Sequence, residues 1–150
     1  MSNVEVAIAI LYQNGRFLMQ LRDDIPGILY PGCWGFFGGH LEPGETPEFG
    51  MRRELMEEIG YCPSELLLFE RMETDRGIVR NIFHGALTVE IESLELNEGW
   101  DLGLVSVEEI QRGNRYSERA GEVRPLGEPH QKILLAFIEQ SQVCKEPTRL

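Results

Sequence analysis

The sequence has no apolar run near the roughly 18 residues that a membrane-spanning helix needs. Its 150 residues include only three cysteines, Cys33, Cys62 and Cys144. An odd number of widely spaced cysteines indicates neither a disulfide framework nor a zinc knuckle. The first residues also lack the basic stretch that begins a secretory signal. We therefore expect a reduced, cytoplasmic protein with no membrane partner.

Basic residues are scarce as well. There are 14 Lys and Arg against 25 Asp and Glu, which gives a formal net charge of −11. Such a chain repels the phosphate backbone of nucleic acids, so we expect no nucleic-acid partner. A phosphorylated small molecule would need a local reversal of charge, from divalent cations or from arginines. Acidity that serves solubility alone is the alternative, and charge by itself does not choose between them.

The remaining composition is that of a globular protein, and we expect one domain over residues 1–150. Alternating apolar residues and turn signals predict strands over residues 4–10, 17–22, 33–37, 66–74, 78–91 and 101–107, with a hairpin turn at Asn14-Gly15. Helices are expected over 47–59, 107–112 and 128–140, with a polar loop over 113–127 and a frayed tail over 141–150. This mixture without βαβ regularity predicts an α/β fold, either α+β or a mixed α/β sandwich.

Helix signals are clearest between residues 46 and 60. Thr46 is a good N-cap, Pro47 suits the first helical position, and Gly60 suits the position after the last turn. A broad apolar arc on this helix is expected to face the core, and it consists of Phe49, Met51, Leu55, Met56 and Ile59.

Three carboxylates of the same helix, Glu54, Glu57 and Glu58, fall on one face because they are spaced by three and four residues. A solvated face held by ion pairs is the alternative, but Glu54 repels Glu58, and a helix C-terminus disfavours negative charge. Arg53 can reach Glu57, yet one cation does not balance three acids. Hard oxygen ligands without a His or Cys cluster indicate a bound Mg²⁺ or Mn²⁺.

These acids belong to a longer pattern, which resembles the signature of the Nudix hydrolase family, G-x5-E-x7-R-E-U-x-E-E-x-G-U, where U is aliphatic. Its defined positions within residues 39–61 are filled by Gly39, Glu45, Arg53, Glu54, Leu55, Glu57, Glu58 and Gly60. Tyr61 stands where an aliphatic residue is usual, which affects packing rather than chemistry. The resemblance implies a single MutT-like domain, an α/β/α sandwich with a mixed central sheet.

The resemblance also implies an activity. Members of the family are metal-dependent hydrolases that cleave the diphosphate linkage of nucleoside diphosphate derivatives, such as nucleoside triphosphates, nucleotide sugars or ADP-ribose. The metal ligands that it implies are the carbonyl of Gly38 and the side chains of Glu54, Glu57 and Glu58, with Glu54 as either a ligand or the general base. Arg53 corresponds to a residue that pairs with Glu45 and orients the acids. The implied catalytic residues are thus Arg53, Glu54, Glu57 and Glu58.

Other positions are candidates by their place around this motif. Glu98 is a candidate for the distal acid that often supplies a further metal ligand or base, and a solvated turn glutamate is the alternative. Trp34 and Phe37 are candidates for stacking on a base, although aromatic residues in short strands are commonly core residues. His40 follows Gly38-Gly39, where a basic residue can meet phosphate, and a plain surface histidine is the alternative.

The expected partner is a small nucleotide substrate. The resemblance to the family also makes a homodimer possible. The alternative function is a non-catalytic nucleotide-sensing module on the same fold. Such modules typically lose acids from the motif, and none is lost here.

Overall fold

The structure is a computed structural model that describes residues 4–74 and 76–141. Its elements fall into two units. The first comprises Met1–Leu11 and Phe37–Asn97, and the second comprises Tyr12–Phe36 and Glu98–Leu150, each within its described residues. The tail that we expected to be frayed over 141–150 lies, after Ser141, outside the described residues. No helix in the described part of the chain is long and apolar enough to cross a membrane.

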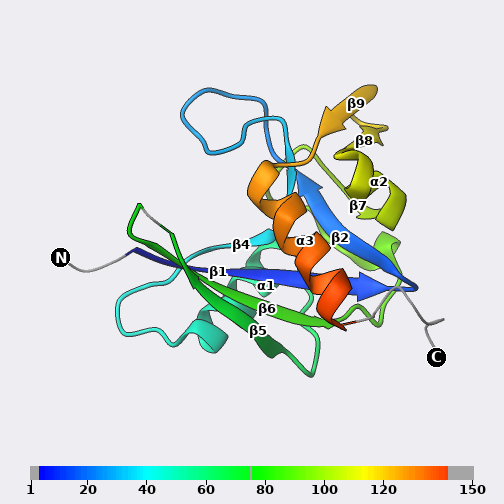
Figure 1. Cartoon of the computed structure of the whole chain (residues 1–150). Coiled ribbons are helices and arrows are strands. Elements are labelled where there is room, and N and C mark those ends of the chain that lie inside the picture. The colour runs from blue at the N-terminus through cyan, green and yellow to red at the C-terminus, as the bar shows by residue number, and fades with distance from the viewer. Residues whose placement is uncertain (1–3, 75, 142–150) are drawn as a thin grey trace. The chain divides into compact units, whose positions relative to one another are not determined.

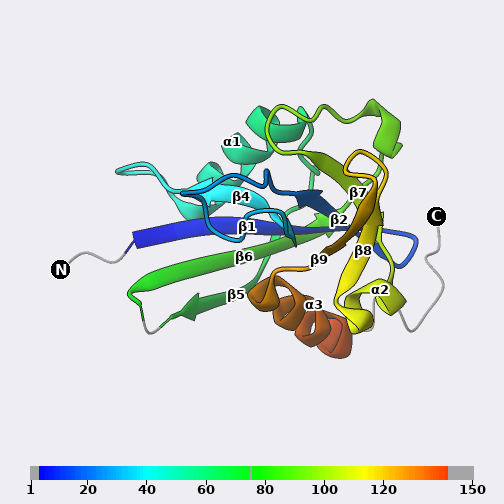
Figure 2. The ribbon, with the colours of Figure 1, turned by 90° about the horizontal axis from the view of Figure 1, so that it is seen from above.

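The first unit is built on a sheet around β1 (Val4–Gln13), which is paired with β4 (Phe37–His40) and with β6 (Ile78–Ala86). β5 (Leu67–Glu73) lies beyond β6 in an antiparallel ladder that shifts register between Leu68 and Glu70. β1, β6 and β5 run side by side in both views of the ribbon (Figure 1 and Figure 2). The β1–β4 ladder pairs Val6 with His40 and Ala9 with Phe37. The segment before the helix that carries Glu54, Glu57 and Glu58 is therefore fixed to the sheet.

Helix α1 (Pro47–Ile59) has the bounds that its end signals predict. The Thr46 side chain accepts a hydrogen bond from the N–H of Phe49 at 3.3 Å. At the other end Gly60 is left-handed, with φ at 67°, and its N–H donates to the carbonyl of Met56 at 3.1 Å. The helix packs against β4, and its Leu55 side chain is buried.

The expected apolar arc of α1 is only partly correct. Met51, Leu55 and Ile59 are buried, but Phe49 is 65% exposed and Met56 is 53% exposed. These two residues stand on either side of Arg52, three and four positions away, so they share its face of the helix. Since the Arg52 side chain is itself 35% exposed, this edge of the arc faces outward.

The second unit contains β2 (Arg16–Leu21), which pairs with β3 (Trp34–Gly35), with β7 (Asp101–Val105) and with the end of β1. The predicted hairpin turn is present, since Asn14 and Gly15 have φ values of 52° and 74°. The other elements of this unit are α2 (Val107–Arg112), β8 (Asn114–Ser117), β9 (Glu122–Pro125) and α3 (Glu128–Ser141).

Three predictions about strands are wrong. The segment 113–127 is not a loop, because β8 and β9 pair from Asn114–Pro125 to Ser117–Glu122, and their polar residues hide any alternation. The strand expected over 33–37 is instead two strands, and β4 continues through Gly38 and Gly39. The strand expected to reach residue 91 ends at Ala86. There the N–H of Thr88 donates to the Tyr61 hydroxyl at 3.1 Å, and a 3₁₀ turn, η1, follows at Ile91–Ser93.

Candidate active site

Arg53 lies among three acidic residues of the first unit, and together they form the Arg53 cluster of Arg53, Glu45, Glu54 and Glu57. Its Nε donates to Oε2 of Glu45, and its Nη2 donates to Oε1 of Glu45 at 2.9 Å. Its Nη1 lies 3.1 Å from Oε1 of Glu54 and 3.2 Å from Oε2 of Glu57. The side chains of Arg53 and Glu45 are 19% and 5% exposed, so their two-pronged pair is largely shielded from water. The expected ion pair is therefore present, and the same guanidinium reaches Glu54 and Glu57, two of the three acids that share one face of the helix.

The Arg53–Glu45 pair has an electrostatic consequence. Hydrogen bonding from Arg53, together with the backbone N–H of Glu42, which donates to Oε1 of Glu45 at 2.8 Å, lowers the pKa of Glu45 to about 2. The hydrogen bond to Glu45 also raises the pKa of Arg53. Both partners stay charged throughout the neutral pH range, so the loop before α1 is held to the helix.

Two glycines of β4 bring the backbone against the acids of α1. The N–H of Gly38 donates to the Glu58 carboxylate, at 3.0 Å to Oε1 and 3.3 Å to Oε2, and Glu58 is only 6% exposed. Gly38 has φ at 150°, and a Cβ there would collide with the carbonyl of Ala7. A Cβ on Gly39 would fall 2.7 Å from Oε1 of Glu54. The missing Cβ thus lets Gly38 lie against the backbone of β1, and it leaves room for the Glu54 carboxylate beside Gly39.

The donor chemistry around Arg53 fits a divalent cation. Carboxylate oxygens are hard ligands of the kind that Mg²⁺ and Mn²⁺ prefer, and the last turn of α1 has no basic residue. In the described residues no group of three or more His, Cys, Asp or Glu side chains already forms a metal-binding arrangement. The acids are instead held by Arg53 and by Gly38, while the Glu57 side chain remains 60% exposed. The residues thus fit in kind, and a metal would compete with Arg53 for their oxygens.

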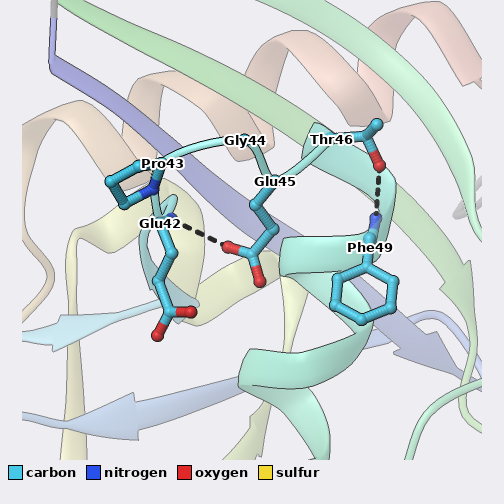
Figure 3. Close-up of a pocket in the computed structure, with 6 residues that line it drawn as sticks. All are labelled: Glu42, Pro43, Gly44, Glu45, Thr46 and Phe49. Atoms are coloured by element: carbon cyan, nitrogen blue, oxygen red, sulfur yellow. Dashed lines mark hydrogen bonds between the residues drawn. The ribbon is translucent and has the colours of Figure 1, made fainter.

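A pocket of about 430 Å³ opens at the loop that leads into α1 (Figure 3). Its lining consists of Glu42, Pro43, Gly44, Glu45, Thr46 and Phe49. Figure 3 shows the Glu45 carboxylate between Glu42 and the Phe49 ring. Nη1 of Arg53 lies 4.0 Å from Oε1 of Glu42, so the pocket adjoins the Arg53 cluster. Sequence reasoning missed Phe49 as a pocket residue because it assigned this side chain to the core.

Two of the candidate substrate contacts lie in the core. Trp34 is 0% exposed, its Nε1–H donates to the carbonyl of Arg115 at 3.1 Å, and the Arg115 guanidinium lies 4.9 Å from its ring centre. Phe37 is 1% exposed. The burial of both rings favours the core alternative over stacking on a base. His40 is exposed at the end of β4, and its carbonyl accepts from Nη2 of Arg53 at 3.4 Å, so it borders the acidic residues.

Glu98 begins the part of the chain that returns to the second unit, and its side chain is exposed. Its role as a metal ligand or base stays a prediction. The residue before it, Asn97, is a feature that sequence reasoning missed, because its side-chain amide donates to the carbonyl of Glu57 at 2.8 Å. Nothing in the local sequence pattern signals that contact, since forty positions separate the two residues.

Comparison with known proteins places these features in a family context. The NUDIX domain model matches residues 1–125. The nucleoside triphosphatase NudI of Enterobacter sp. (strain 638) is 40% identical over 55 residues, which are 37% of this chain and 38% of that protein. NudI of Escherichia coli (strain K12 / DH10B) is 37% identical over 65 residues, 43% of each protein. The chain therefore matches less than half the length of these curated relatives.

Solved structures share the fold over most of the chain. A structure from a study of MutT from Aliivibrio salmonicida and Vibrio cholerae has a TM-score of 0.68 at 23% identity, covering 91% of this chain and 98% of that one. MutT from Methanosarcina mazei Go1 has a TM-score of 0.69 at 20% identity, with 94% and 96% covered. The NUDIX domain of Shewanella oneidensis NrtR, solved with ADP ribose, has a TM-score of 0.67 at 18% identity, with 95% and 88% covered. The predicted α/β fold, with a mixed central sheet and flanking helices, is confirmed.

Proposed function

The chain belongs to the NUDIX domain family, and on that premise we propose that it is a metal-dependent pyrophosphohydrolase of a nucleoside diphosphate derivative. A nucleoside triphosphate is the first substrate that we propose, because the NudI relatives are named nucleoside triphosphatases. ADP-ribose is the second, because the similar NUDIX domain of NrtR was solved with that ligand.

The observation that carries this proposal is the excess of carboxylates around Arg53. Glu45, Glu54 and Glu57 each lie within 3.2 Å of its guanidinium, and Glu58 lies on the same helix with its carboxylate at Gly38. A polyphosphate would be repelled by this cluster unless cations lay between them. A divalent ion offsets both the excess of carboxylate charge and the repulsion of the polyphosphate, because it binds carboxylate and phosphate oxygens together.

We assign the metal to Glu57 and Glu58, with the carbonyl of Gly38 as a further ligand and Glu54 as either a ligand or the general base. When bound, Mg²⁺ or Mn²⁺ supplies neutralisation of the diphosphate and stabilisation of the charge that develops in the transition state. Arg53 keeps the carboxylates of Glu54 and Glu57 on its side of the helix, since its Nη1 contacts both. The largely shielded pair with Glu45 keeps Arg53 itself in place.

The proton of the attacking water needs an acceptor, and we assign this role to Glu54. Its side chain is 16% exposed, next to Gly39 and to Arg53, so water reaches it while its position is restricted. Glu98 is the alternative acceptor and a further possible ligand. Trp34 and Phe37 are buried, so His40 is the residue of the three that we retain as a substrate contact.

The proposal is tested by incubating the protein with nucleoside triphosphates, ADP-ribose, nucleotide sugars and dinucleoside polyphosphates, with Mg²⁺, Mn²⁺ or EDTA, and by separating the products chromatographically. We expect metal-dependent cleavage within one substrate class, and the products identify the bond that is cut. Glu57→Gln should reduce turnover at least about a hundredfold, because it removes a charged ligand. Glu48→Gln is the matched control, since Glu48 is on the same helix but pairs with Arg52 in an exposed ion pair.

Full activity of the Glu57→Gln variant would contradict the assignment of the metal site. Nucleotide binding without cleavage of any compound would contradict the hydrolase and favour the nucleotide-sensing module. A homodimer is the assembly that we propose, and sedimentation velocity at several protein concentrations tests it.

A further inference from the structure

The last turn of α1 brings backbone carbonyls that are unpaired within the helix close to two acidic side chains. The final carbonyls of a helix have no partners within the helix, and their dipoles repel nearby carboxylates. Glu57 and Glu58 stand in this turn, and it contains no basic residue. The groups that hold these carbonyls therefore determine where the two acids are placed.

The segment 95–97 supplies three donors to this turn. The N–H of Glu95 donates to the carbonyl of Ile59, and the N–H of Asn97 donates to the carbonyl of Glu58, both at 3.0 Å. Nδ2 of Asn97 donates to the carbonyl of Glu57 at 2.8 Å. The same amide lies 3.2 Å from Oε2 of Glu95, which fixes its orientation. Asn97 thus holds the main chain of both proposed metal ligands, through its side chain and its backbone.

We propose that Asn97 is a positioning residue for the metal site, which acts by fixing the main chain of Glu57 and Glu58. The inference rests on the proposed function, since it concerns the same ligands. Glu58 has a second anchor, because its buried carboxylate accepts from the N–H of Gly38. The Glu57 carboxylate contacts Nη1 of Arg53 at 3.2 Å, but its side chain is 60% exposed, and a metal would compete with Arg53 for its oxygens. The Asn97 amide therefore acts chiefly through Glu57.

The chain offers a matched control in the second unit. Nε2 of Gln131 donates to the carbonyl of Ile110 in α2, also at 2.8 Å. This contact is again a side-chain amide that holds a carbonyl of a helix, but α2 carries none of the proposed ligands. A purely structural role for Asn97 predicts that Asn97→Ala and Gln131→Ala have the same kinds of effect. A positioning role predicts that only Asn97→Ala alters the metal site.

The experiment measures Mn²⁺ binding by electron paramagnetic resonance, without nucleotide, for the wild type and for Asn97→Ala, Asn97→Leu and Gln131→Ala. Loss of a group that orients a metal ligand typically weakens affinity by 10- to 100-fold. We expect both Asn97 variants to raise the Kd for Mn²⁺ about tenfold, and Gln131→Ala to leave it unchanged. Asn97→Leu keeps much of the side-chain volume without the donor, so its loss of affinity identifies the hydrogen bond rather than packing. Thermal unfolding of each variant verifies that it is folded.

Because Asn97 precedes Glu98, the Asn97→Ala change is also made in a Glu98→Gln background. We expect the same fold-loss of affinity there, since the effect runs through Glu57, and a vanishing effect would overturn the proposal. Wild-type affinity in Asn97→Ala, or an equal loss in Gln131→Ala, would also overturn it while leaving the proposed function intact. A wild-type protein that binds no Mn²⁺ would instead overturn the proposed function, and the inference with it.

Discussion

The ion pair between Glu45 and Arg53 leads to a prediction about stability and pH. Glu45 accepts from two nitrogens of the guanidinium and from the backbone N–H of Glu42, so its charged form has three donors. These contacts hold its pKa at about 2, against an ordinary value of 4.5. Glu45→Gln removes the charge and keeps the shape of the side chain. We expect the variant to have a lower free energy of unfolding than the wild type at neutral pH, and we expect this difference to depend on pH.

The direction of this pH dependence follows from the pKa of Glu45, which is about 2 in the folded protein and 4.5 in the unfolded chain. Between about pH 4.5 and pH 2, the unfolded chain binds a proton at Glu45 that the folded chain does not bind. Near pH 3.25 the difference is about 0.9 proton, if the two states titrate independently. The stabilisation from Glu45 is therefore fully present above pH 4.5 and is lost as the pH falls toward 2. The variant has no carboxylate at this position and lacks this dependence.

The assay is chemical unfolding of the wild type and of Glu45→Gln at pH 7, 5.5, 4.5, 4 and 3.5. We expect a constant difference in the free energy of unfolding between pH 7 and 5.5, and a narrowing difference below pH 4.5. Glu48→Gln removes the same charge from an exposed pair on the following helix and should change stability little. A difference that is as large at pH 3.5 as at pH 7 would refute the reasoning. Carbon-13 titration of the Glu45 carboxyl provides the direct check, with a midpoint near 2 expected.

Two further substitutions test how the scaffold supports the site. Gly38→Ala places a Cβ against the backbone at Ala7, and we expect a loss of about 1–3 kcal/mol in stability together with reduced turnover. Thermal unfolding measures the first effect, and an unchanged melting temperature would contradict the steric argument. Tyr61→Phe removes a hydroxyl that bonds the carbonyl of Ala86 at 3.2 Å and Thr88 at 3.0 Å. We expect a loss of about 1 kcal/mol in urea unfolding, and equal stability of the two proteins would show that water replaces these bonds.

Tyr61 also illustrates how far the motif pattern reaches. At the position where an aliphatic residue is usual, the departure was expected to affect packing rather than chemistry. In the structure its hydroxyl joins the end of α1 to the segment after β6, where the predicted strand stops early. The pattern located the residue correctly, but its partners lie 25 and 27 positions away and depend on the pairing of strands.

Features that depend on near neighbours in the chain followed from the sequence alone. The bounds of α1, the turn at Asn14-Gly15 and the common face of Glu54, Glu57 and Glu58 are set by capping, by positive φ and by helical spacing. Only the tertiary structure decided which distant groups meet these acids. The N–H of Gly38 reaches Glu58 because α1 packs against β4, and Asn97 reaches Glu57 because the segment 95–97 returns to the end of the helix. The burial of Trp34 and the exposure of Phe49 were decided in the same way, since side-chain periodicity describes one element while burial depends on what packs against it.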